Sequence, residues 1–121
     1  MARTEPPTPR AAASAGAITG PVEIQIACGD DAEAGRIARA LVERRLAACV
    51  QRLPIRSTYR WEGEVVDDDE VLLLVKTMAD RFDGIVATVD ELHSYELPAV
   101  SVVAIAGGSI RYLDWIADVT R

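Results

Sequence analysis

Polar and apolar residues follow one another along the chain in blocks that predict alternating strands and helices. Apolar side chains occupy every second position over residues 22–28, which predicts a half-buried strand with Cys28 on its apolar face. Apolar residues then recur at three- and four-residue intervals, which predicts a helix over residues 31–46. Asp30 has the position of an N-cap and Glu33 completes the spacing of a capping box, with its side chain expected to face away from the apolar stripe.

A β-hairpin is predicted in the middle of the chain. A short apolar segment is expected to be interrupted at Pro54, and residues 56–62 alternate as a second strand. The turn could lie at Glu62-Gly63 or at the aspartate run 67–69, since both compositions suit turns. We favour the glycine, with the aspartates forming a bulge in one long strand. Residues 71–75 are wholly apolar, as expected of a central strand covered on both faces.

The last third of the chain predicts two more helices around a further strand. Thr77 is expected to cap a helix that ends near His93, and residues 100–106 predict a strand that a Gly-Gly pair ends. Ser109 is expected to cap a final helix with four inward-facing side chains, Tyr112, Leu113, Ile116 and Ala117. The order of elements predicts an α+β fold, a ferredoxin-like α/β sandwich (βαββαβ plus a C-terminal helix) with an antiparallel sheet.

Length and composition are typical of one globular domain, with 121 residues of which 50% are apolar and 26% charged. We assign residues 21–121 to this domain and residues 1–20, rich in Ala, Pro, Thr and Ser, to a disordered N-terminal tail. The alanine-rich stretch 11–18 is too weak to favour a secretion signal. The net charge of −6 disfavours nucleic acid as a partner, and no apolar run reaches the roughly 20 residues of a membrane span.

Residues that could bind a metal ion are few. Cys28, Cys49 and the single histidine, His93, cannot supply a four-ligand Cys/His zinc site within one chain. His93 is a candidate ligand for Cu(II) or another divalent cation, or else a partly exposed residue at a helix end. Cys28 is a candidate soft ligand, or else a small buried apolar residue. Two cysteines without a Cys-x-x-Cys motif are typical of a reduced, cytoplasmic protein.

The sequence lacks the motifs of several common enzyme classes. There is no G-x-S-x-G, no phosphate-binding glycine loop and no H-E-x-x-H, so we expect a protein that is not an enzyme. The acidic run 67–70 lacks the spacing of a calcium loop and is expected to be a solvated strand edge. Tyr59 and Trp61 share a strand face, where they are expected to fill a subunit interface or to stack on a ligand.

Five segments taken together resemble the CutA divalent-cation-tolerance family. They are residues 37–50 (IARALVERRLAACV), 59–64 (YRWEGE), 71–77 (VLLLVKT), 91–98 (ELHSYELP) and 112–116 (YLDWI). The resemblance covers about residues 22–119. Gly29 and Ser94 stand where the family commonly has proline, and neither departure changes the expected fold.

The resemblance implies a PII-like homotrimer whose sheets meet edge to edge and whose long hairpins reach across subunits. It also implies a role in tolerance of copper and other divalent cations, with a metal ion or small ligand bound in clefts between subunits. The candidates for that cleft are the polar and aromatic residues of the resembling segments, Trp61, Glu62, Lys76, Tyr95 and Glu96. For Lys76, a Lys–Glu pair that stabilises the trimer is an equally good interpretation. The alternative function is a PII-like scaffold or signalling module that docks a protein partner, with metal binding incidental.

Overall fold

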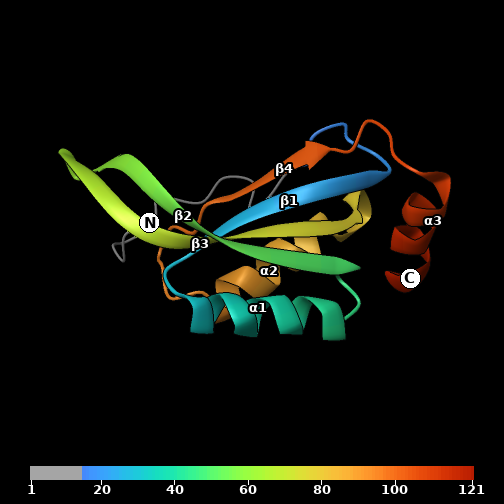
Figure 1. Ribbon diagram of the computed structural model, residues 1–121, viewed down its shortest axis with the longest axis horizontal. Helices are drawn as coiled ribbons and strands as arrows, with labels where there is room; N and C mark the ends of the chain where they lie inside the picture. Colours follow the sequence, from blue (N-terminus) through green and yellow to red (C-terminus); the bar gives the residue numbers. More distant parts are fainter. Residues whose placement is uncertain (1–14) are drawn as a thin grey trace.

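The computed structural model describes residues 15–121, which fold into a four-stranded antiparallel sheet with two helices packed on one face (Figure 1). The elements in chain order are β1 (Pro21–Cys28), α1 (Asp31–Glu43), β2 (Cys49–Trp61), β3 (Glu64–Met78), the short 3-10 helix η1 (Ala79–Arg81), α2 (Phe82–Leu92), β4 (Val100–Ala104) and α3 (Ile110–Val119). The strand order is β2-β3-β1-β4. The predicted ferredoxin-like α+β fold and its antiparallel sheet are therefore confirmed.

The hydrophobic core lies between the sheet and the helices α1 and α2. The alternation predicted for β1 is confirmed, since Val22, Ile24 and Ile26 are fully buried. They belong to one cluster with apolar side chains of the two helices, Ile37, Leu41, Ile85 and Val89. Each such side chain stabilises the fold by about 1.5–3 kcal/mol through its removal from water. Helix α3 lies apart from this core, beside β1 and β3 at one end of the sheet (Figure 1).

The capping prediction for α1 is confirmed at Asp30, whose carboxylate accepts a hydrogen bond from the Glu33 amide at 2.8 Å. The helix ends at Glu43 rather than at residue 46. It stops there because Arg45 adopts a left-handed conformation with φ 58°, which a right-handed helix of L-residues does not continue. The Glu33 side chain is buried, so the expectation that it faces away from the apolar stripe is wrong.

Strands β2 and β3 form one long hairpin, paired without a break from Cys49 and Lys76 to Trp61 and Glu64. The predicted turn at Glu62-Gly63 is confirmed, with φ of 49° and 83°, values typical of a tight two-residue hairpin turn. Strand β1 pairs with β3 only as far as Val71. The hairpin end therefore projects beyond the rest of the sheet (Figure 1).

Two expectations for this hairpin are wrong. Pro54 does not interrupt the strand, because it lies opposite Val71 in a continuous β2. Strand β2 is at the edge of the sheet, where a residue without an N–H group can be accommodated. The aspartates 67–69 form no bulge, since each has one partner in an unbroken register. Cross-strand contacts hold them there, including a 2.8 Å ion pair between Arg56 and Asp69.

The segment between β3 and α2 also differs from the prediction. Thr77, expected to cap the helix, lies inside β3, and its buried hydroxyl donates to the Leu46 carbonyl oxygen at 2.6 Å. The turn η1 leads into α2 instead, and no side chain caps either element. Helix α2 ends at Leu92 and His93 follows as its C-cap, as predicted.

The final helix is capped as predicted, because the Ser109 hydroxyl accepts a hydrogen bond from the Tyr112 amide at 3.4 Å. Its inward face is narrower than expected. Ile116 is fully buried, whereas Tyr112 is 40% exposed, since the helix touches only the end of the sheet. Strand β4 ends at Ala104, two residues before the predicted limit.

The predicted N-terminal tail is described only in part. Residues 1–14 lie outside the described residues. Within residues 15–20, Ala15 and Ile18 are partly buried against the core, and the Gly20 carbonyl oxygen accepts a hydrogen bond from Ala79 at 2.8 Å. Among residues 15–121, no helix has the length and apolar character needed to cross a membrane.

Candidate metal centre

Three element ends converge on one buried point of the molecule. Cys28 is the last residue of β1, Glu33 lies in the first turn of α1, and His93 directly follows α2. One ligand atom from each residue, a thiol sulfur, a carboxylate oxygen and an imidazole nitrogen, lies within 4.8 Å of the other two. The fold therefore brings together the two residues predicted to bind metal, Cys28 and His93, and adds a carboxylate between them.

His93 is held on both ring nitrogens, and its side chain has no exposed surface. Its Nε2 lies 2.7 Å from the Ala27 carbonyl oxygen, and its Nδ1 accepts a hydrogen bond from the Tyr95 amide at 3.0 Å. These two contacts assign a neutral ring with the proton on Nε2. His93 does stand at the helix end and is partly exposed as a residue, but the exposed part is backbone and the imidazole itself is buried.

Glu33 supplies the negative charge of the cluster. Its Oε2 accepts a hydrogen bond from the Ser94 amide at 3.0 Å, and its Oε1 lies 3.4 Å from the Nδ1 of His93. Burial opposes ionisation, but hydrogen bonds from Ser94 and Gly29 favour the charged form, and the pKa of Glu33 is lowered; protonation of the neighbouring imidazole would lower it further. The carboxylate is therefore ionised inside the protein at neutral pH.

Sequence reasoning missed Glu33 although the signal was present. Glu33 precedes Ile37 by four residues and Leu41 by eight, and side chains at these intervals share one helix face. All three are buried. The capping-box spacing predicts a contact with the backbone amides at the helix start. The Glu33 side chain lies instead mainly against His93 and Ser94, which follow α2.

Cys28 contributes a protonated thiol. Burial, and then the negative charges of Glu33, Glu70 and Asp30, raise the pKa of its thiol to about 12. A cation bound beside the sulfur would reverse this effect, because metal binding to a thiol releases its proton. The alternative interpretation of Cys28 as a buried small residue also describes it correctly, since its exposed fraction is 0%.

Tyr95 borders this cluster. Its ring centroid lies 4.7 Å from that of His93, and its buried hydroxyl donates to Glu70 at 3.2 Å. Glu96, the next residue, is exposed in the loop after α2. Tyr95 thus packs against the imidazole of His93 within a single chain.

The other predicted cleft residues lie far from this point within one chain. Trp61 and Glu62 are at the hairpin turn, whereas Lys76 is at the opposite end of β3. Lys76 forms a 2.9 Å ion pair with Glu23 and donates to Gln51 at 2.9 Å, so it is satisfied by its neighbouring strands. A cleft that unites these residues would have to form between subunits, and it stays a prediction.

The donor set suits a soft or borderline cation. Sulfur, imidazole nitrogen and one carboxylate oxygen are ligands for copper or zinc, whereas Mg²⁺ and Ca²⁺ prefer oxygen alone. Three ligand atoms within 4.8 Å can surround one ion. Both ring nitrogens of His93 are already hydrogen-bonded, so binding through the imidazole requires the loss of one of these contacts.

The chain is therefore a ferredoxin-like α+β protein in which three element ends bring a buried cysteine, carboxylate and histidine together. Residues 22–119 match the family model described as "CutA1 divalent ion tolerance protein". The chain belongs to this family of divalent-cation-tolerance proteins.

Individual relatives agree with this assignment. The chain is 51% identical over 85 residues to the divalent-cation tolerance protein CutA of Thermus thermophilus, covering 69% of this chain and 82% of the relative. It is 37% identical over 126 residues to protein CutA of Homo sapiens, covering 100% of this chain and 70% of the relative. The solved structure of CutA from Archaeoglobus fulgidus superposes with a TM-score of 0.82 at 36% identity, covering 84% of this chain and 99% of that one.

Proposed function

We propose that the chain contributes to metal tolerance by binding a soft or borderline cation, copper above all, at Cys28, Glu33 and His93. The convergence of their ligand atoms within 4.8 Å in the buried interior is the observation that carries this proposal. The family's association with divalent cations supports it. The proposed role is binding and not catalysis, in keeping with a family described by its tolerance to divalent ions.

Each residue has a distinct part in this proposed site. Glu33 provides a negative charge at neutral pH, and Cys28 provides sulfur once its proton has left. His93 provides a neutral nitrogen whose lone pair is released when a neighbouring hydrogen bond opens. The bound cation would supply the positive charge that this cluster lacks.

Titration with Co(II) tests the site, because coordination by a thiolate gives an intense charge-transfer absorption that oxygen ligands do not. Wild-type protein and the Cys49→Ala control are expected to develop this absorption with equal affinity. The Cys28→Ala variant is expected to lose the absorption and to bind at least about tenfold more weakly, a loss of one ligand. Retention of the band in Cys28→Ala, or its loss in Cys49→Ala, would exclude this site.

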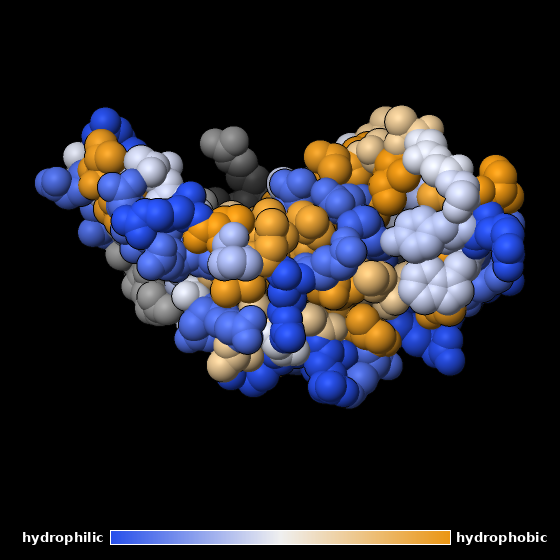
Figure 2. Space-filling model, in the orientation of Figure 1, coloured by the Kyte–Doolittle hydropathy of each residue, from blue (hydrophilic) through white to orange (hydrophobic). Residues whose placement is uncertain are grey.

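We also propose that the chain assembles as a homotrimer in the cytoplasm. Helices α1 and α2 cover only one face of the sheet, and apolar side chains gather on the surface over the middle of β2 and β3 (Figure 2). Leu53 is 38% exposed, and it lies on the face of β2 opposite the helices, because the side chain of its neighbour Arg52 reaches Asp31 of α1. The indole Nε1 of Trp61 is buried without an acceptor among residues 15–121, and an acceptor from a neighbouring subunit would satisfy it.

The oligomeric state can be measured by sedimentation equilibrium of matched charge variants. Leu53→Glu places a carboxylate on the proposed interface and is expected to dissociate the trimer. Val42→Glu is the control, because Val42 is similarly exposed at 44% but lies on α1, on the helical side of the molecule. A wild-type monomer, or equal behaviour of the two variants, would contradict the proposed interface.

A further inference from the structure

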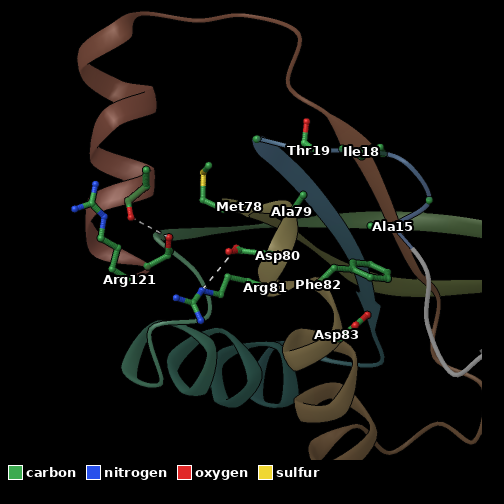
Figure 3. A pocket seen from close by; sticks show the side chains of 14 residues that line it. Ala15, Ile18, Thr19, Met78, Ala79, Asp80, Arg81, Phe82, Asp83 and Arg121 are labelled. Carbon is green, nitrogen blue, oxygen red and sulfur yellow. Dashed lines mark hydrogen bonds and ion pairs between the residues drawn. The ribbon is translucent and has the colours of Figure 1, made fainter.

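The metal centre is almost closed to solvent. The side chain of Glu33 is 6% exposed, and that of His93 has no exposed surface. A cavity of about 650 Å³ at the opposite end of β1, beside Asp80 and Arg81, is lined by none of the metal-centre residues (Figure 3). A groove between α1 and β2 does not include them either. A cation therefore needs a local opening of the chain to reach the centre.

The loop of residues 94–98, between α2 and β4, contacts this centre directly. Its Ser94 amide donates to Oε2 of Glu33 at 3.0 Å, and its Tyr95 amide donates to Nδ1 of His93 at the same distance. Ser94 itself is exposed, whereas Tyr95 is buried. Two amides of one loop thus bind the same two side chains that would bind a cation, and the loop is the element whose opening would expose them.

His93 can bind a cation only by losing its contact with Tyr95. A neutral imidazole has one nitrogen with a free lone pair, and here it is Nδ1, because Nε2 carries the proton that it donates to the Ala27 carbonyl oxygen. Coordination through Nδ1 takes the lone pair that accepts the Tyr95 amide. Coordination through Nε2 moves the proton to Nδ1, where it would face the N–H group of Tyr95. In both modes the Tyr95 amide has to leave the ring.

The position of Glu33 favours coordination through Nδ1. Its Oε1 lies 3.4 Å from Nδ1 of His93. A nitrogen and an oxygen that bind one tetrahedral Zn²⁺ at about 2.1 Å each are about 3.4 Å apart, so these two atoms already have the spacing of a ligand pair. The thiol of Cys28 lies within 4.8 Å of a ligand atom of each residue. The Tyr95 amide is therefore the group that a cation must displace.

Tyr95 connects the centre to the long β2–β3 hairpin. Its hydroxyl donates to Oε2 of Glu70 at 3.2 Å. Glu70 directly precedes Val71, where the pairing of β3 with β1 ends, so it lies at the base of the projecting part of the hairpin. We propose that a cation bound at the metal centre displaces the Tyr95 amide, opens the loop 94–98 and weakens the contact of Tyr95 with the hairpin base. This inference rests on the metal centre proposed above.

Hydrogen exchange of the Co(II)-loaded protein tests the opening of the loop. The absorption band reports coordination by sulfur, and mass spectrometry of the same sample reports exchange of the amides in residues 94–98. Exchange there is expected to accelerate at least about tenfold when Co(II) is added, the effect of losing one hydrogen bond. A thiolate band without faster exchange of the loop would overturn this inference and leave the metal centre in place. Absence of the band would overturn both.

The variant Tyr95→Phe tests the coupling from the other direction. Coupling between two events is reciprocal, so a loop that opens more easily should bind a cation more tightly. Tyr95→Phe removes the hydroxyl contact with Glu70 and keeps the ring and the amide. Its affinity for Co(II) is expected to rise about threefold to tenfold, the net contribution of one hydrogen bond. Tyr112→Phe, on the exposed side of α3, is the matched control and should bind as the wild type does. Unchanged or lower affinity in Tyr95→Phe would overturn the proposal.

Discussion

The imidazole of His93 donates from Nε2 to the carbonyl oxygen of Ala27 at 2.7 Å, which ties the end of α2 to the end of β1. The same ring accepts from the Tyr95 amide and lies beside the carboxylate of Glu33. The candidate metal ligand is therefore also a structural residue. Substitutions at this position change stability as well as binding, and experiments must separate the two effects.

Replacement of His93 by alanine should lower the free energy of unfolding by about 2–4 kcal/mol, since it removes two buried hydrogen bonds and leaves a cavity. His93→Gln should cost less, because its amide can still donate towards Ala27. Urea unfolding at one fixed protein concentration measures both variants. An alanine variant as stable as the wild type would show that these contacts contribute little.

The thiol of Cys28 should resist modification in the folded protein. Burial and neighbouring carboxylates raise its pKa to about 12, so almost no thiolate is present at about pH 8. In Cys49→Ser, where Cys28 is the remaining thiol, a disulfide reagent should react at least about a hundredfold more slowly in the folded state than after denaturation. Fast labelling of folded Cys49→Ser would contradict the buried position of Cys28. In the Cys28→Ser variant, the labelling rate of the remaining thiol, the half-buried Cys49, provides the comparison.

Stability should fall when the solution is acidified below the ordinary glutamate pKa of 4.5. The pKa of Glu33 is lowered by the hydrogen bonds described above, and that of Glu23 by contacts with Gln25 and Lys76. A lowered folded-state pKa contributes stability that is present above the unfolded value and is lost as the pH falls through the folded value.

Denaturant unfolding at several pH values between about 7 and 3 measures this dependence. Glu33→Gln and Glu23→Gln should each reduce the loss of stability on acidification. Glu43→Gln serves as the control, because its side chain is 64% exposed, and it should leave the pH dependence unchanged. An unchanged pH dependence in Glu33→Gln would mean that this carboxylate is not stabilised by its buried partners.

Replacement of Gly63, the glycine of the hairpin turn, should lower the stability of the protein. Its φ of 83° strains any residue with a Cβ atom, so Gly63→Ala should destabilise the protein by about 1–2 kcal/mol. Gly107→Ala is the matched control, because an added Cβ there meets no atom within 4 Å and its φ is not positive. Thermal or urea unfolding compares the two, and equal stability would argue against the turn geometry.

The predictions that succeeded rest on local rules. The burial of Ile24 and Ile26 follows from strand alternation, and the caps at Asp30 and Ser109 follow from side-chain hydrogen bonding to nearby amides. Pro54 was misjudged because its local effect on a strand depends on whether that strand lies at a sheet edge. Thr77 was misjudged because its hydroxyl finds a partner, Leu46, that lies far away in the sequence.

The candidate site likewise combines features that follow from local sequence with features that depend on contacts between distant segments. Sequence alone singled out Cys28 and His93 by the metal affinity of their side chains, and family resemblance supplied the association with divalent cations. It could not show that these residues meet, because they lie 65 positions apart and join only when β1 and α2 pack together. Nor could it show the charge of Glu33, which depends on hydrogen bonds from Ser94. The chain by itself determined the order of elements and the apolar stripes, which are periodic and local. Only the tertiary structure decided which polar side chains are buried together, because that depends on contacts between distant segments.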